Sequence, residues 1–288
     1  MRRSASSRFA RAAGWLVLLA AAALVCVVVL AEIDRKFSYP LSLQELYVDQ
    51  KLRPLVSAYN TVVRAAVRDC PPIFSRAQLE ETFPMHALFE NQWREIAREA
   101  LQVYAQQRLP AFHEVHEAFN PISSPQWTVF VLKWYDKPVE ANMAKCPVTA
   151  ACVRAVPQVQ AAMFSILAPG TRIPPHRGPS CCSVRYHLGL KVPRGALDAQ
   201  GRLRRARIRV DRAWYEWKEG EGVMFDDTYE HEVVNDTQEV RIVLFMDVLR
   251  KLPTALDRVN VFLSERARLS EFVSSINARA EVQEKVRM

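Results

Sequence analysis

Two stretches of the chain, residues 163–190 and 225–245, place a few histidines and arginines beside apolar, strand-like runs. His176 lies in the first stretch and His231 lies in the second. Histidines this far apart, each next to a strand-like run, favour a metal ion held across a β-sheet over one held on a single helix. Arg241 follows the second histidine by ten residues, and its guanidinium can bind a carboxylate through two parallel hydrogen bonds. These residues predict a metal site with a dicarboxylate bound beside it.

The segment between the two histidines alternates along its length as a β-strand does. In residues 183–192, Arg185 and His187 share one face with Gly189 and Lys191. The opposite face carries the apolar side chains Val184, Tyr186, Leu188 and Leu190. If the first face points into a barrel, its charged residues need a polar or anionic partner there, because a charge buried alone is costly.

Short apolar runs separated by turn residues recur through the second half of the chain and predict a mainly β protein with flanking helices. Strands or hairpins are expected at 128–135, 161–167, 183–192, 206–222, 222–235 and 240–248. Helical spacing of apolar residues predicts an amphipathic helix at 88–107 and a short helix within 145–160. The predicted core is a double-stranded β-helix, or jelly-roll.

The N-terminal region has the pattern of a membrane anchor. No charged residue occurs from Ala12 to Ala31, and a helix needs about 20 apolar residues to span a bilayer. We predict one transmembrane helix at 14–31 and therefore a single-pass membrane protein. A cleaved signal peptide and a buried helix are the alternatives. Four arginines precede the span, which favours a cytosolic N-terminus and a folded domain on the far side of the membrane.

The formal net charge of +8 suggests an anionic neighbour. The arginines are spread along the chain and no nucleic-acid motif is found, so we expect a membrane surface and no nucleic acid as the partner. None of the six cysteines forms a CxxC pair, which argues against a zinc finger. Free thiols are expected from their spacing.

The metal-ligand pattern is incomplete when it is read from the residues alone. Non-haem iron oxygenases commonly use two histidines and one carboxylate, with the first two ligands spaced as His-x-Asp or His-x-Glu. Here Gly178 stands where that carboxylate is expected after His176. An aspartate at position 178 would be expected to supply the third metal ligand. Asp226 and Asp227 precede His231 by a few residues, and their part in the site is left open.

The segments HRGP, RYHLGL and FDDTYEHEV, with the arginine that follows them, resemble the aspartyl/asparaginyl β-hydroxylase family. The resemblance extends from about Phe83 to Val248. It implies an enzyme that depends on Fe(II), 2-oxoglutarate and O2 and that holds iron with two histidines and no carboxylate. The implied roles are iron ligation by His176 and His231, binding of the distal carboxylate of 2-oxoglutarate by the catalytic residue Arg241, further co-substrate contacts from Ser165, Arg185 and His187, and Gly178 at the position of the missing carboxylate.

Within that family, the segments LKWYDKPVEANMAKCP and VPQVQAAMF and the predicted anchor resemble the bacterial lipid A acyl-chain hydroxylases. The HRG triplet is nearer to the branch that hydroxylates Asp and Asn side chains in proteins. The sequence therefore predicts hydroxylation of a lipid A-type acyl chain. Hydroxylation of a protein substrate is the alternative, and a catalytically silent ligand-binding barrel is a further one.

With this resemblance, the chain divides into five predicted segments. They are a basic stub at 1–13, the transmembrane helix at 14–31, a helical linker at 32–82, a dioxygenase domain at 83–252 and an amphipathic C-terminal helix at 253–288. Two positions are open for the last helix, which could lie on the membrane surface or pack on the barrel.

Overall fold

The computed structural model describes residues 53–67, 70–116, 122–178, 180–268, 276, 278–281 and 283–284. The predicted basic stub and transmembrane helix lie outside these residues. Within the described ranges, no helix is long and apolar enough to cross a membrane. No disulfide joins the five cysteines of this part of the chain.

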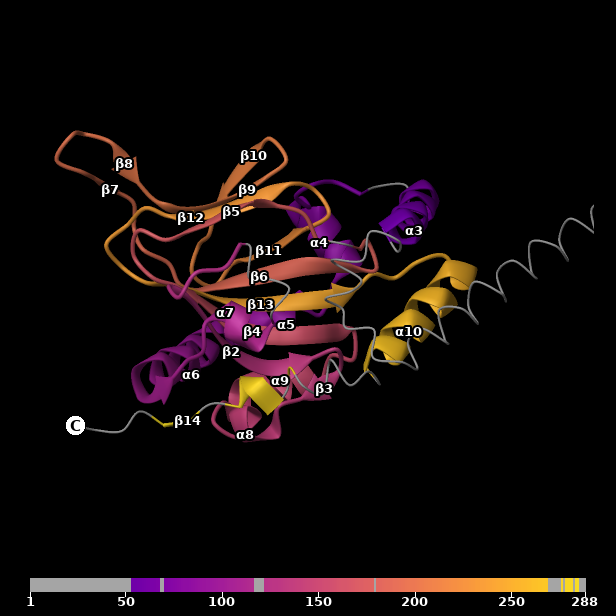
Figure 1. Cartoon of the computed structure of the whole chain (residues 1–288), viewed down its shortest axis with the longest axis horizontal. Helices are drawn as coiled ribbons and strands as arrows, with labels where there is room; N and C mark the ends of the chain where they lie inside the picture. Colours follow the sequence, from indigo (N-terminus) through magenta and orange to yellow (C-terminus); the bar gives the residue numbers. More distant parts are fainter. Residues whose placement is uncertain are drawn as a thin grey trace, which may run out of the picture. The chain divides into compact units, whose positions relative to one another are not determined.

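Two antiparallel sheets form the centre of the fold (Figure 1). The larger sheet has the order β11-β6-β13-β4-β2-β3, with β2 at Trp127–Trp134, β3 at Lys137–Pro138, β4 at Val159–Leu167, β6 at Ser183–Lys191, β11 at Gly222–Phe225 and β13 at Arg241–Leu249. The smaller sheet has the order β10-β9-β12-β5, with β5 at Arg172–His176, β9 at Ala206–Val210, β10 at Ala213–Glu216 and β12 at His231–Asn235. Two short pairs lie outside these sheets, β7 (Ala196–Leu197) with β8 (Leu203–Arg204) and β1 (Gln107–Arg108) with β14 (Gln283–Glu284).

The strand order is that of a jelly-roll. Along the chain, β4, β6, β11 and β13 belong to the larger sheet, whereas β5, β9, β10 and β12 belong to the smaller one. The chain thus passes back and forth between two facing sheets, and each sheet pairs strands that are distant in sequence. The prediction of a mainly β, jelly-roll core is confirmed, and β2 and β3 extend the larger sheet beyond it.

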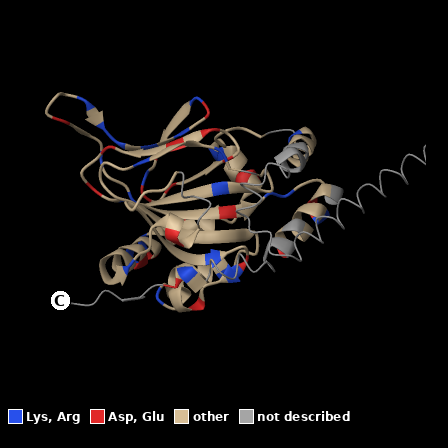
Figure 2. Ribbon diagram, viewed as in Figure 1, with Lys and Arg blue, Asp and Glu red and all other residues tan. Residues whose placement is uncertain are grey.

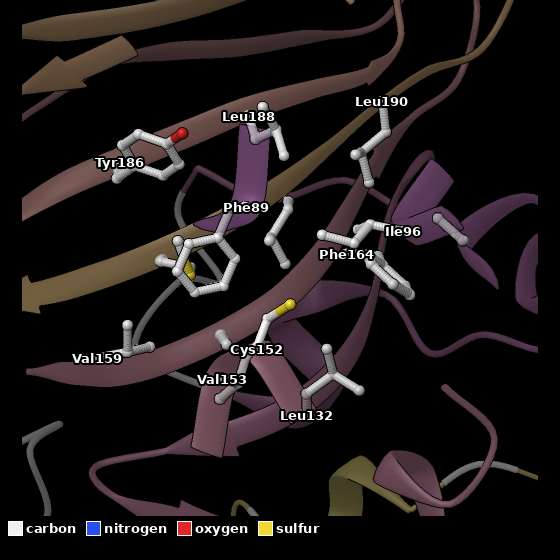
Figure 3. Packing of buried hydrophobic residues seen from close by; sticks show 14 of the residues in the cluster. Phe89, Ile96, Leu132, Cys152, Val153, Val159, Phe164, Tyr186, Leu188 and Leu190 are labelled. Atoms are coloured by element: carbon white, nitrogen blue, oxygen red, sulfur yellow. The ribbon is translucent and has the colours of Figure 1, made fainter. Parts of the chain in front are cut away.

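The larger sheet is buried on both faces, and its side chains alternate between two separate cores. On β6, Val184, Tyr186, Leu188 and Leu190 belong to the core that the helices cover, as the alternation in the sequence predicts. Figure 3 shows this core around Phe164 and Tyr186. The opposite face of the same strands points between the two sheets, where Val243 and Phe245 of β13 belong to the second core. Every second residue of each of these strands therefore projects into the jelly-roll interior.

Helices cover the outer face of the larger sheet. The described helices are α3 (Arg53–Ala66), α4 (Arg76–Thr82), α5 (His86–Asn91), α6 (Trp93–Gln106), α7 (Phe112–Val115), α8 (Glu140–Met143), α9 (Pro147–Arg154) and α10 (Thr254–Arg268). Helix α6 buries Ile96 and Ala100 against this sheet, as expected for an amphipathic helix. The carboxylate of Glu99 accepts hydrogen bonds from the first turn of α9, which ties the two helices together.

Part of the segment predicted as a linker belongs to this folded unit. Phe74 and Leu79 are buried in the helix-covered core, and the Phe74 amide donates to the carbonyl of Met224 on β11. Ser75 caps α4 by accepting a hydrogen bond from the amide of Gln78. The chain is therefore packed on the sheet well before Phe83.

The C-terminal region differs from the single helix predicted at 253–288. Helix α10 ends at Arg268, and β14 pairs with β1 near the end of the chain. Between them, Ile276 and Ala280 are buried against the interior core, and the Asn142 side chain donates to the Ala280 carbonyl at 2.8 Å. These contacts show that the described C-terminal residues pack on the domain, with 276 and 278–280 helical and 283–284 paired as a strand.

A buried ion pair joins the end of β13 to the loop before β12. Arg250 and Asp226 are almost fully buried, with 2.8 Å between Nη2 and Oδ2. The same guanidinium donates from Nε to the carbonyl of Cys181. Loss of one partner from such a pair leaves a charge buried without compensation.

We expect Arg250→Met to lower the free energy of unfolding by about 3–5 kcal/mol, because the Asp226 carboxylate would remain buried and unpaired. Chemical denaturation followed by tryptophan fluorescence measures this loss. Arg154→Met is the matched control, since Arg154 pairs with Glu140 on the surface and such pairs contribute about 0–1 kcal/mol. Equal losses in the two variants would contradict a structural role for the buried pair.

Candidate functional site

The two predicted ligands, His176 and His231, meet at one end of the smaller sheet. His176 is the last residue of β5 and His231 is the first residue of β12. The antiparallel pairing of these strands places them directly opposite each other, and their ring centroids are 4.0 Å apart. Neighbouring strands thus bring together two histidines that are distant in sequence.

Backbone hydrogen bonds determine which nitrogen of each ring is available. The Nδ1 atom of His176 lies 2.7 Å from the carbonyl of Pro174, and that of His231 lies 3.0 Å from the carbonyl of Tyr229. A carbonyl oxygen can only accept, so each Nδ1 carries the proton and each Nε2 keeps its lone pair. This is the tautomer in which a histidine binds a metal through Nε2, with the other nitrogen held by a second hydrogen bond.

Burial keeps both rings neutral. It lowers the pKa of His176 to about 4. It also lowers the pKa of His231 well below its usual value, with a further contribution from His176. Neutral imidazoles with an available lone pair have the form that a divalent metal requires.

Arg241 is buried deep in the jelly-roll interior. Its side chain is 1% exposed, at the start of β13. One Nη1 hydrogen bond, of 3.2 Å, goes to the Ser165 carbonyl, and the guanidinium lies 4.8 Å from the ring centroid of Trp217. The Nε atom has no hydrogen-bond partner among the described residues. Burial lowers the pKa of Arg241 to about 9, so the group is charged at neutral pH. It has no counter-ion among the described residues.

His187 and Trp217 add further unpaired nitrogens beside this arginine. Both ring nitrogens of His187 and Nε1 of Trp217 are buried without a hydrogen-bond partner in the described structure. The His187 ring lies near Trp217, Phe225 and Phe245, at 5.0–6.0 Å between centroids. Burial and the nearby Arg241 lower the pKa of His187 well below its usual value. A buried group of unpaired donors is costly unless a ligand accepts from it.

Ser165 lies on the same interior face. It pairs with Val243 of the neighbouring strand, and its hydroxyl accepts a hydrogen bond from Nε1 of Trp127 at 3.0 Å. A hydroxyl that accepts one bond still has a proton to donate. Ser165 can therefore donate to a ligand that also reaches Arg241.

Arg185 lies at the histidine end of the interior, where carboxylates from two other segments surround it. Its guanidinium is 2.9 Å from both Asp227 and Asp247 and lies 4.2 Å from the ring centroid of Phe245. The structure therefore brings Arg185 into the site, but the contacts it describes engage the guanidinium with protein carboxylates.

The expectation about Gly178 needs correction. A Cβ atom at position 178 would lie 2.2–2.5 Å from the carboxylate atoms of Asp227. The Gly178 amide also donates to the Asp227 carbonyl at 2.7 Å. The space is thus filled by the carboxyl group of a neighbouring segment, so an aspartate at 178 has no room unless Asp227 moves.

Asp227 is a site residue whose role the sequence left open. Burial raises its pKa to about 6, and the nearby Asp247 adds to the shift, although Arg185 opposes it. Its position in FDDTYEH, just before the second histidine, was the available signal. Trp217 carried no signal, because it reaches the interior from a loop between β10 and β11.

Among the described residues, no group of three or more His, Cys, Asp or Glu side chains is arranged to hold a metal ion. The histidine pair is therefore the candidate ligand set. A metal held there would have its remaining positions open to small molecules.

Similar solved structures include the cupin domain of a transcriptional regulator from Enterobacter cloacae and a DMSP lyase from Ruegeria pomeroyi. The first has a TM-score of 0.24 and 14% identity and covers 31% of this chain and 79% of its own. The second has a TM-score of 0.28 and 10% identity and covers 43% and 47%. These scores are too low to support an argument, and the assignment of the fold rests on the strand order above.

Sequence comparison identifies the family. The aspartyl/asparaginyl β-hydroxylase model matches residues 90–251. An ornithine lipid ester-linked acyl 2-hydroxylase from Rhizobium tropici is 37% identical, over 70% of this chain and 69% of its own length. The human aspartyl/asparaginyl β-hydroxylase is 36% identical, over 37% of this chain but only 12% of its own length. This chain therefore belongs to the aspartyl/asparaginyl β-hydroxylase family and is a hydroxylase.

Proposed function

We propose that this hydroxylase is an Fe(II)- and 2-oxoglutarate-dependent dioxygenase that acts on an acyl chain of a membrane lipid. One observation carries the proposal. A pair of neutral histidines at the end of the jelly-roll leads inward to a buried arginine that lacks a counter-ion. That arrangement suits a metal and a dicarboxylate bound side by side.

The residues fit both groups. His176 and His231 would hold Fe(II) through their Nε2 atoms, which the carbonyl contacts leave available. Bound iron, together with 2-oxoglutarate and O2, supplies the oxidising power needed to hydroxylate an unactivated C–H bond. The protein's own groups bind and orient the co-substrate and keep water out.

Arg241 is suited to the distal carboxylate of 2-oxoglutarate. Its charge is buried and uncompensated, and its Nε atom is free to donate. A carboxylate there would remove the cost of the unpaired guanidinium. The Ser165 hydroxyl can donate to the same carboxylate, while Trp217 covers one face of the guanidinium and excludes water.

Arg185 and Asp227 are suited to stabilising the histidine end of the jelly-roll interior, which we call the mouth of the site. Their ion pair joins β6 to the loop that precedes His231. The buried pair of Asp226 with Arg250 fixes the same loop one residue earlier. These contacts would help to orient the second histidine.

A lipid substrate is supported by the relative from Rhizobium tropici, whose name specifies an acyl chain of ornithine lipid. A lipid A-type acyl chain is the other candidate, from the resemblance noted in the sequence. We infer that the predicted helix at 14–31 anchors the enzyme in the membrane that contains this lipid. Hydroxylation of Asp or Asn in proteins is the second candidate function, supported by the human relative.

Mass spectrometry of total lipid and total protein, from cells with and without the chain, tests the proposal. We expect a gain of one oxygen on an acyl chain that depends on the intact chain. The same gain on Asp or Asn residues, with unchanged lipids, would establish the second candidate. Absence of succinate formation from 2-oxoglutarate would show that the chain does not use this co-substrate.

His231→Ala should abolish iron binding and turnover while the fold survives, because one histidine would remain to hold the metal. Metal analysis of the purified variant measures the loss, and circular dichroism checks the fold. His113→Ala is the matched control, since His113 contacts Ser123 outside the site. Equal iron content in the His231→Ala variant and the parent would place the metal elsewhere.

Arg241→Lys keeps the charge but loses the two parallel donors of the guanidinium. Hydrogen bonds to charged groups contribute about 1.5–3 kcal/mol, so the apparent KM for 2-oxoglutarate should rise by roughly 10- to 100-fold. Iron content should not change, because Arg241 is not a ligand. Steady-state kinetics measure the effect, and Arg154→Lys, on the exposed surface of α9, serves as the control. An unchanged KM would mean that the co-substrate binds elsewhere.

A further inference from the structure

We propose that two adjacent hairpins, β7–β8 and β9–β10, form a docking surface for an anionic membrane. We call residues 194–216, which contain both hairpins, the arginine hairpins. This inference rests on the proposed lipid substrate and states how the enzyme would reach it. It is independent of the predicted transmembrane anchor, which lies in another part of the chain.

The first observation is charge. The arginine hairpins contain seven arginines and three acidic residues, a balance of 7 − 3 = +4. The whole chain carries +8, so half of its formal charge falls in this short segment. Figure 2 shows the basic residues along both hairpins.

Part of this charge is compensated within the protein. Asp198 pairs with Arg202 and Arg204, while Arg209 pairs with Glu230 and Glu232 of the neighbouring segment. When Glu230 and Glu232 are counted with the arginine hairpins, the net charge of the group is 4 − 2 = +2. Arg194 and Arg212 are exposed and have no ion pair within the described structure. These two arginines are available to an anionic partner.

The second observation is exposed apolar surface on the same two hairpins. Leu197 and Leu203 face each other across the β7–β8 pair and are 69% and 44% exposed. Trp214 on β10 is 43% exposed, and the Arg207 guanidinium lies 4.2 Å from the centroid of its ring. Tryptophan and leucine beside arginine are the combination that enters the interface of a bilayer, with the cations at the headgroups.

The third observation is position. The strands β9 and β10 belong to the smaller sheet, and the β7–β8 pair precedes β9; both hairpins lie on the side away from the larger sheet (Figure 1). Val210, at the end of β9, pairs with His231, and the Asp211 amide in the next turn donates to the Glu230 carbonyl at 2.8 Å. The β9–β10 turn therefore lies beside the histidine pair. A membrane held by this turn would bring lipid to the mouth of the site.

These observations favour a lipid surface over an acidic protein. Arginines alone would suit either partner. A pair of leucines near a hairpin tip and an exposed tryptophan on the neighbouring hairpin supply apolar anchors of the kind that bilayer interfaces accept. An anionic headgroup layer also attracts basic segments without requiring a defined sequence in the partner.

Hydrogen exchange of the full chain in nanodiscs tests the proposal. One set of discs contains phosphatidylglycerol and the other only phosphatidylcholine. We expect the amides of 194–216 to exchange at least about tenfold more slowly in the anionic discs. The protection should weaken in about 0.5 M NaCl, where exposed charges are screened.

A triple variant, Leu197→Ser with Leu203→Ser and Trp214→Ser, should lose this protection and hydroxylate lipid about tenfold more slowly, a change of about 1.4 kcal/mol. Its conversion of soluble 2-oxoglutarate to succinate in the absence of lipid should equal that of the parent. Leu101→Ser is the matched control, because Leu101 on α6 is 42% exposed and lies outside the arginine hairpins. It should retain both the protection and the rate.

Equal exchange of the arginine hairpins in the two kinds of disc would overturn the docking surface. Protection by an aspartate-rich peptide, but not by lipid, would also overturn it and would indicate a protein partner. The proposed function fails separately. If the hairpins are protected but no lipid is hydroxylated, the docking surface stands and the lipid substrate is wrong. If lipid is hydroxylated but the hairpins are not protected, the lipid substrate stands and the docking surface is wrong.

Discussion

Burial of the larger sheet on both faces is the constraint on which the structure depends. Its strands must be apolar on the side that the helices cover, where Phe164 and Leu244 pack. Their other side faces the smaller sheet, and only there can a strand carry polar residues toward a shared interior. Ser165, His187 and Arg241 all occupy strand positions whose side chains point inward, and the strand register brings them near one another. The same alternation that builds the core therefore assembles the site.

The jelly-roll interior holds several polar groups that are incompletely paired and that lie beside one another. A buried guanidinium, a histidine and an indole leave nitrogens without partners in the described structure. The buried guanidinium of Arg250, by contrast, is paired with the carboxylate of Asp226. Unpaired donors are costly and persist where a ligand completes them. The contrast between the unpaired Arg241 and the paired Arg250 is the physical basis for proposing that Arg241 binds the co-substrate.

The histidine pair depends on a different element, the antiparallel pairing of β5 and β12. Carboxylates brace this end of the jelly-roll, with Asp227 between Gly178 and Arg185. A glycine at 178 is required because any side chain would displace that carboxylate. The β9–β10 hairpin belongs to the same smaller sheet, so the sheet that holds the proposed metal ligands also carries part of the proposed lipid contact.

Local patterns, together with the family resemblance, predicted which side chains would lie together in the candidate site. Alternation in 183–192 identified the inward face of β6, strand-like runs beside His176 and His231 indicated a sheet-held metal, and the interval to Arg241 indicated a bound carboxylate. The alternation follows from the two-residue period of a strand, which the sequence records directly. Tertiary structure alone decided that Asp227 fills the space beside Gly178, that Trp217 covers Arg241, and that the C-terminal residues pack on the domain. Each of these depends on contacts between segments distant along the chain, and no local period encodes which distant segments will meet.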